Sequence, residues 1–130
     1  MREERTLTGR WQFVGAEKYN GSDWQTSENY VPDMIWTFEP QYFGENKIIG
    51  NITETTPSGD PIIMAYAYDK RTTLLKIDIS TECSSGEEDG SQADICDVIY
   101  ADDEQSIKLN ILTHPNYPQQ YFRYTLQKID

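Results

Sequence analysis

Apolar side chains alternate with polar ones along most of this chain, and the alternation restricts the fold more than any other feature. Between residues 106 and 113, for example, Ile107, Leu109 and Ile111 alternate with Lys108 and Asn110. Side chains two positions apart share one face of a β-strand, whereas a helical face repeats every three to four residues. Alternation of this kind predicts eight short strands, which span residues 9–19, 34–39, 47–55, 62–68, 73–81, 94–101, 106–113 and 119–129.

The segments between these strands are mostly short and rich in turn-forming residues, as in Asn20-Gly21-Ser22-Asp23. Short antiparallel strands at even spacing favour an up-and-down β-barrel, because closing the sheet removes its exposed edges. The sequence therefore predicts an all-β fold, an eight-stranded antiparallel up-and-down β-barrel, with a β-sandwich as the alternative. A length of 130 residues suits one domain, which we assign to residues 7–130 after an N-terminal tail of residues 1–6.

The sequence also predicts one face of the first strand and the form of two connecting segments. In the first strand, Trp11, Phe13 and Gly15 are expected on one face. Residues 24–31 are expected to form a polar loop that bears an aromatic residue and acts as a lid. Residues 40–46 are expected to turn the chain between the second and third predicted strands.

An eight-stranded barrel has an interior just wide enough to be filled by side chains or to hold one small ligand. Tyrosine hydroxyls inside it need hydrogen-bonding partners, which favours water or a ligand with polar atoms. The alternative is that these rings simply pack the core. The side chains predicted to line the interior, and so to bind a ligand, are Trp36, Phe38, Met64, Tyr66, Tyr68, Val98, Tyr100 and Tyr124.

Charge and hydropathy exclude several classes of partner. The chain has 22 acidic residues and 11 basic ones, with neither Lys nor Arg between Lys76 and Lys108. Such a surface repels phosphate backbones, so we expect no nucleic-acid partner. No uninterrupted apolar stretch is long enough for a membrane-spanning helix. The acidic loop 84–93 is expected to be solvated.

Residues suited to catalysis or metal binding are few. His114 is the only histidine, and it lies in a predicted loop without acidic or nucleophilic partners at useful spacing. The acidic run that contains Glu87, Glu88 and Asp89 lacks the alternating ligand spacing of a calcium loop. We therefore expect no catalytic residues, no metal site and no cofactor. An acid–base enzyme that uses Tyr66, Tyr68 and Glu54 is the least favoured alternative.

The two cysteines are Cys83 and Cys96. If the strand alternation continues through both, Cys83 shares the apolar face of Leu75 and Ile77, and Cys96 shares that of Val98. Both thiols then point the same way near the open end of one hairpin loop, where a disulfide is geometrically easy. A disulfide would favour an extracytoplasmic location, whereas two reduced, buried thiols remain the alternative.

The chain resembles the lipocalin-like (calycin) proteins, and it looks similar to the small secreted lipocalin-like domains of bacteria related to Bacteroides. The residues that carry this resemblance are the Leu7-Thr8-Gly9-Arg10-Trp11 start, Trp36-Thr37-Phe38, the hairpin formed by Tyr66-Ala67-Tyr68 and Leu75-Lys76-Ile77, and the closing Tyr124-Thr125-Leu126-Gln127-Lys128-Ile129. Members of this family often place a basic residue over the tryptophan, a role open here to Arg123 or Lys128.

The resemblance implies a β-barrel that binds an apolar ligand outside the cytoplasm. We therefore expect an extracytoplasmic binding protein, whether periplasmic, secreted or lipid-anchored, whose leader precedes Met1. Its ligand is expected to be a small apolar or amphipathic molecule held in the barrel. The alternative is a filled barrel that binds a protein or a glycan through its rim loops.

Overall fold

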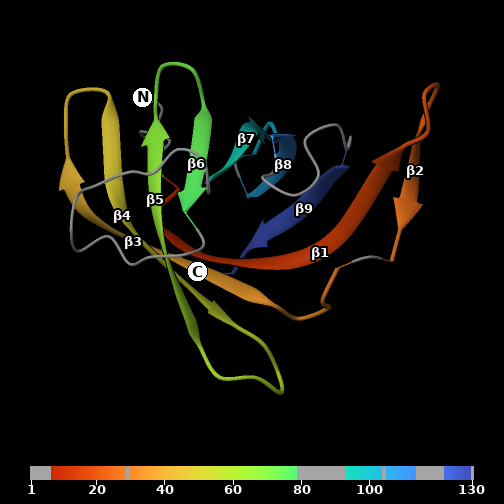
Figure 1. Ribbon diagram of the computed structural model, residues 1–130, viewed down its shortest axis with the longest axis horizontal. Helices are drawn as coiled ribbons and strands as arrows, with labels where there is room; N and C mark the ends of the chain where they lie inside the picture. Colours follow the sequence, from red (N-terminus) through yellow and green to blue (C-terminus); the bar gives the residue numbers. More distant parts are fainter. Residues whose placement is uncertain (1–6, 29, 79–92, 104, 114–121, 130) are drawn as a thin grey trace.

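The computed structural model describes residues 7–28, 30–78, 93–103, 105–113 and 122–129. These residues form an all-β fold in which no helix is present and no segment is a candidate membrane-spanning helix (Figure 1). Within them nine strands are assigned, which are β1 (Gly9–Tyr19), β2 (Trp24–Ser27), β3 (Ile35–Phe43), β4 (Lys47–Thr55), β5 (Ile62–Asp69), β6 (Leu74–Asp78), β7 (Ala93–Tyr100), β8 (Ser106–Thr113) and β9 (Phe122–Lys128).

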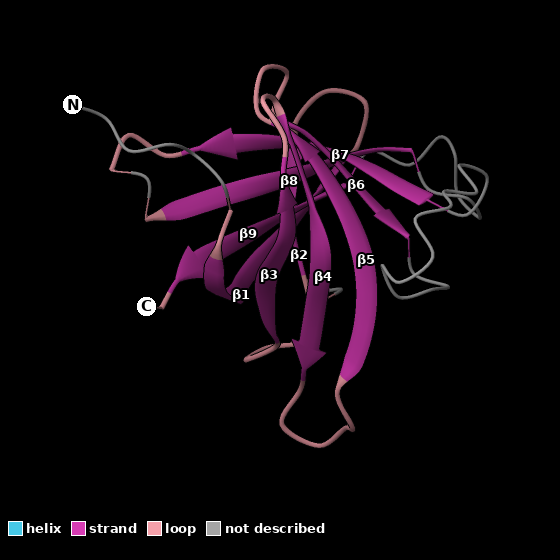
Figure 2. Ribbon diagram, turned by 90° about the vertical axis from the view of Figure 1, so that its left-hand side faces the viewer, coloured by secondary structure: helices cyan, strands magenta, loops and turns pink. Residues whose placement is uncertain are grey.

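The described strands form one antiparallel sheet that closes on itself. From β3 to β9 each strand pairs with the next, β1 pairs with β3, and a further pairing between β1 and β9 closes the ring. The eight strands of this ring are therefore a closed antiparallel barrel, and Figure 2 shows them curving around a common interior. The predicted fold class is confirmed.

The predicted polar loop at residues 24–31 is partly wrong, because β2 occupies its first half. Within the described sheet β2 is an addition to the ring of eight, and it pairs with the second half of β1 from Ala16 to Tyr19. The Asn20 side chain forms the turn between them by accepting hydrogen bonds from the backbone N–H groups of Ser22 and Asp23, each at 2.9 Å. A turn this tight lets the chain fold back on β1, so the polar residues that follow form a strand.

A register shift between Phe13 and Gly15 corrects the predicted face of β1. Trp11 and Phe13 are buried as expected, but the next buried residue is Ala16, and Gly15 is only partly buried. A β-bulge adds one residue to one strand and so reverses the alternation beyond it. Period-two alternation cannot locate such an insertion.

The prediction that residues 40–46 turn the chain is also wrong for its first part, since β3 continues through Pro40 to Phe43. The register between β3 and β4 shifts between Pro40 and Tyr42, and Gly50 lies opposite Pro40. A β-carbon added to Gly50 would lie only 2.7 Å from Pro40 Cα and closer still to the Glu39 carbonyl oxygen. The strand therefore accommodates a proline by means of a bulge and a glycine on its neighbour.

The two ends of the barrel differ. We call them the β3–β4 end and the β4–β5 end, after the turns at residues 44–46 and 56–61 that they carry (Figure 1). Side chains in the half toward the β3–β4 end are packed. Examples with 0% or 1% exposure are Phe38, Ile48, Tyr68, Leu75, Ile107 and Leu126.

Trp11 belongs to this packed half and is 2% exposed. Its Nε1 donates a hydrogen bond to the Leu7 carbonyl at 3.0 Å, and Lys128 Nζ lies 5.7 Å from the ring centroid. Lys128, opposite Trp11 in the β1–β9 pairing, is thus the basic residue that covers the tryptophan. Arg123 instead places its guanidinium 4.0 Å from the ring centroid of Trp24.

Candidate functional site

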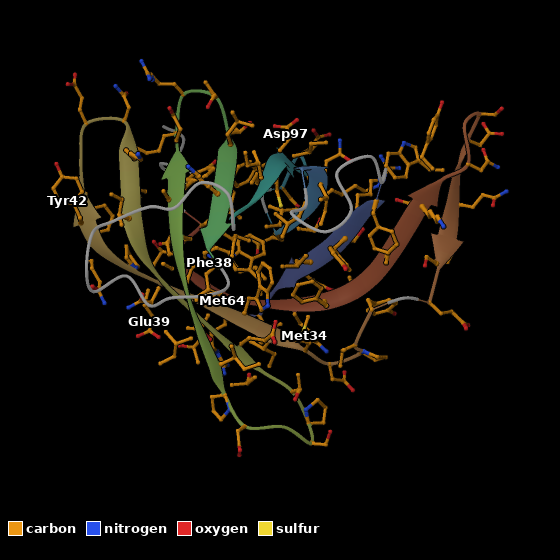
Figure 3. The ribbon with its side chains drawn as sticks, viewed as in Figure 1. Met34, Phe38, Glu39, Tyr42, Met64 and Asp97 are labelled. Carbon is orange, nitrogen blue, oxygen red and sulfur yellow. The ribbon has the colours of Figure 1, made fainter. Side chains whose placement is uncertain are left out.

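The residues predicted to line the interior do share the inner face of the barrel. Five are buried in the core, and three are partly buried and pack against it. The buried ones are Phe38, Met64, Tyr66, Tyr68 and Val98, and the partly buried ones are Trp36, Tyr100 and Tyr124. Figure 3 shows Phe38 and Met64 in the interior, with Met34 where β3 begins.

Aromatic rings from β9, β1, β3 and β5 contact one another on this inner face. Tyr124 and Trp36 both make edge contacts with Phe13, with centroid separations of 5.3 and 4.9 Å. Trp36 continues to Phe38 at 6.2 Å, and Phe38 to Tyr66 at 5.2 Å. Edge-to-face pairs of this kind stabilise the arrangement by about 0.5–1.5 kcal/mol each beyond area burial. The rings are therefore held in place by one another.

Phe13 links two of the predicted residues but was not itself predicted to bind ligand. The sequence could have indicated this role, because Phe13 lies two residues after Trp11 and so shares its face of the strand. Tyr68 and Tyr100 meet in a different way, with their hydroxyl oxygens 3.0 Å apart in a hydrogen bond. That bond supplies a partner for a hydroxyl inside the packed half and favours a filled interior there.

Several partly buried or exposed apolar side chains of the inner face lie at the β4–β5 end. The partly buried residues against the core include Met34, Trp36, Ile111 and Tyr124. Ile62, which shares the β5 face of the buried Met64, is 52% exposed. The inner face therefore continues from a packed core to side chains that a solute can touch, and this end is the candidate binding site.

One row of paired residues across β1, β3, β4 and β5 shows how the inner face passes from buried to exposed side chains. Trp11 pairs with Trp36, Trp36 with Glu54, and Glu54 with Ile62. Directly opposed residues share a face, and barrel strands tilt against the barrel axis, so the row climbs toward one end as it crosses the sheet. It begins at the buried Trp11 and ends at the exposed Ile62. Between them, Trp36 Nε1 donates a hydrogen bond to Glu54 Oε1 at 2.8 Å.

Charged side chains form a separate cluster on the outer face. Glu17 accepts hydrogen bonds from Arg123 Nε at 2.7 Å and from Lys108 Nζ at 3.4 Å. The Arg123 hydrogen bond, with the positive charges of Lys108 and Arg123, holds the pKa of Glu17 below its ordinary value of 4.5. Arg123 also covers one face of Trp24, so this cluster fastens β2 and β9 to β1.

Several sequence predictions fall wholly or partly outside the described residues. His114, Cys83 and the acidic run at Glu87–Asp89 lie there, so the predicted disulfide stays a prediction, with Cys96 buried on β7. Within the described ranges no group of three or more His, Cys, Asp or Glu side chains is arranged to hold a metal ion. Glu54 lies opposite Ile62, four residues and about 13 Å along β5 from Tyr66, so the register separates the acid–base residues considered above.

Together these features define a class, a closed antiparallel β-barrel with an aromatic inner face that is packed in one half and accessible at one end. Neither a known protein family nor a curated protein matches the sequence. A solved structure of an uncharacterized protein from Bacteroides eggerthii DSM 20697 is similar, with a TM-score of 0.50 and 15% identity over 95% of this chain and 100% of that chain. At this identity the similarity shows the fold alone.

Proposed function

We propose that this protein is an extracytoplasmic, lipocalin-like binding protein that holds a small apolar or amphipathic molecule at the β4–β5 end of its barrel. The observation that carries the proposal is the accessible apolar inner face there, where Met34, Trp36, Tyr124 and Ile62 continue the buried core outward. The packed half supplies a rigid floor, and the accessible half supplies the contact surface.

The arrangement of these side chains suits binding more than catalysis. Trp36 and Tyr124 each contact Phe13, so a ligand would meet rings that are already held in position. Groups that are ordered before binding lose little conformational entropy when the ligand arrives. Aromatic side chains also provide large apolar contact areas together with a polar group at the edge.

The alternative function, a filled barrel that binds a protein or a glycan through its rim, has one observation in its favour. The half toward the β3–β4 end contains buried core side chains, such as Tyr68 and Leu75 at 0% exposure. The tryptophan of the predicted rim segment is a poor platform for a sugar ring, however, because the Arg123 guanidinium covers one face of Trp24. We therefore rank rim binding second.

The extracytoplasmic location rests on the predicted disulfide between Cys83 and Cys96 and on the lipocalin resemblance. Intact-mass measurement of the native protein tests it. If the bond is present, reduction raises the mass by about 2 Da, and thiol labelling of the denatured, unreduced protein is nil, whereas a reduced but buried thiol would be labelled once denatured. Stoichiometric labelling of the native protein would remove the main argument for an extracytoplasmic location.

Ligand binding is tested with a panel of fatty acids, sterols, bile acids, alkylamines, haem and short oligosaccharides, read by thermal shift and tryptophan fluorescence. A ligand that binds only the native state at 100 times its Kd raises the free energy of unfolding by about 2.7 kcal/mol. The fluorescence response should be lost in Trp36→Phe and retained in the matched Trp24→Phe variant, because Trp24 lies on β2 outside the ring of eight described strands.

A saturable response to an apolar or amphipathic class, dependent on Trp36, supports the proposed function. A response to oligosaccharides alone would favour rim binding instead. Equal loss of response in the Trp36 and Trp24 variants would remove the β4–β5 end as the site.

A further inference from the structure

Glu54 is a charged residue at an inner-face position of β4, where the preceding positions are apolar. The inner-face positions of β4 before it include Ile48 and Ile52, which are both fully buried. Glu54 continues the same alternation, and its register partners Trp36 and Ile62 are an aromatic and an aliphatic residue. A carboxylate therefore stands within the apolar inner face, at the accessible end of the barrel.

Among the described residues this carboxylate has one hydrogen-bond donor. Trp36 Nε1 donates to Oε1 at 2.8 Å, and no Lys or Arg among the described residues forms an ion pair with Glu54. An ionised carboxylate has about four acceptor positions, whereas an indole N–H is a single donor. The hydrogen bond thus orients the carboxylate and leaves it most of its capacity to accept.

Several basic side chains of the described residues have partners of their own, away from Glu54. Arg123 and Lys108 both pair with Glu17 on the outer face, and Lys128 lies over Trp11. The whole chain carries a formal net charge of −11, which raises the local concentration of cations around it. The net charge of the chain and the position of Glu54 therefore both favour a positively charged solute at the β4–β5 end.

We infer that the ligand of the β4–β5 end is an amphipathic cation, with an ammonium group bound by Glu54 and an apolar chain laid against Trp36, Met34 and Ile62. This inference rests on the proposed function and specifies its ligand class. The ammonium donates to the carboxylate in a charge-assisted hydrogen bond. The face of the Trp36 ring adds a cation–π attraction, which is strongest for tryptophan among the aromatic residues.

The same geometry disfavours a ligand with an acidic head. A fatty-acid carboxylate at this position would meet the negative charge of Glu54 without a basic side chain from the described residues to compensate it. Among ligands with the same apolar chain, the charge of the head group should therefore decide the affinity.

The test compares decylamine, decanol and decanoate at concentrations at which each is monomeric in solution, by calorimetry and by tryptophan fluorescence near pH 7. Decylamine should bind at one site at least about tenfold more tightly than decanoate, the factor expected for one hydrogen bond to a charged group. In Glu54→Gln this preference should fall to about threefold or less. The matched control is Glu39→Gln, which removes an exposed carboxylate on the neighbouring strand β3 and should leave the preference unchanged (Figure 3).

The outcomes separate the two proposals. Similar affinities for the three probes, or a preference that survives in Glu54→Gln, would overturn the cationic ligand and leave apolar binding in place. A preference lost equally in the Glu39 variant would assign it to overall charge and overturn the role of Glu54. If none of the three probes binds but another apolar class of the panel does, this inference is overturned and the proposed function stands. If no apolar or amphipathic member of the panel binds either, both are wrong. Thermal unfolding of each variant verifies that it is folded.

Discussion

Replacement of Gly50 by alanine should destabilise the barrel strongly, because the β3 bulge leaves no room for a methyl group. An added β-carbon would lie 2.7 Å from Pro40 Cα and 3.0 Å from the Glu39 carbonyl carbon. Both are backbone atoms of a paired strand, so neither can rotate away as a side-chain tip would. Relief of the clash requires β3 to move away from β4, and the paired residues from Ile35 to Phe43 resist that movement.

Overpacking of a well-packed site costs about 1–3 kcal/mol, and a clash with backbone on a paired strand belongs at the upper end. A loss of about 3 kcal/mol corresponds to a fall in Tm of roughly 9–15 °C for a domain of this size. Urea and thermal unfolding, followed by circular dichroism, measure both quantities.

The matched control is Gly15→Ala on β1. Its added β-carbon would meet only Thr125 Cβ, at 3.9 Å, which is an ordinary contact. The expected change is therefore between zero and a gain of about 1 kcal/mol, from reduced entropy of the unfolded chain. If Gly50→Ala is as stable as the parent protein, or if the two variants lose the same stability, the argument from the bulge is refuted.

Three further predictions concern the charged cluster, the covered tryptophan and the core. Glu17→Gln should lower stability near pH 7 and lose its effect at low pH. The reason is that the pKa of Glu17 in the folded protein lies below 4.5, so its ionised form stabilises the fold at pH values above the unfolded pKa. This stabilisation disappears as the pH falls through the pKa of the folded protein. A difference in unfolding free energy between the variant and the parent that stays constant from about pH 7 to about pH 3 would contradict this. Lys128→Met should cost about 0.5–1 kcal/mol in urea unfolding through the lost cation–π contact with Trp11, and no loss would contradict that contact. Leu126→Ala, at a position with 0% exposure, should cost about 2–5 kcal/mol in the same assay, and a loss below about 1 kcal/mol would show a loosely packed interior.

The structure confirms that the fold class follows from local sequence pattern. The bounds predicted for β1, β4 and β8 coincide with those observed, and Trp11, Phe38 and Leu109 are buried as their parity requires. The inner-face positions of the eight predicted lining residues also follow from alternation. Their role in binding stays a prediction, because position on a face does not by itself establish a ligand.

Two of the errors made from sequence arise where the alternation is interrupted. The bulge after Phe13 moved the buried position from Gly15 to Ala16, and the bulge after Pro40 extended β3 past a proline that looked like a turn. The strand β2 has almost no apolar alternation, and it forms because the preceding turn lays it beside β1.

What the sequence by itself determined was the set of strands and most of their inward faces, because a period of two is a property of neighbouring residues. Only the tertiary structure decided which residues meet across strands. In the folded barrel Lys128, and not Arg123, covers Trp11, and Glu54 lies beside Trp36 at the β4–β5 end. The physical reason is that cross-strand register depends on bulges and on barrel closure, which bring together residues far apart in the chain.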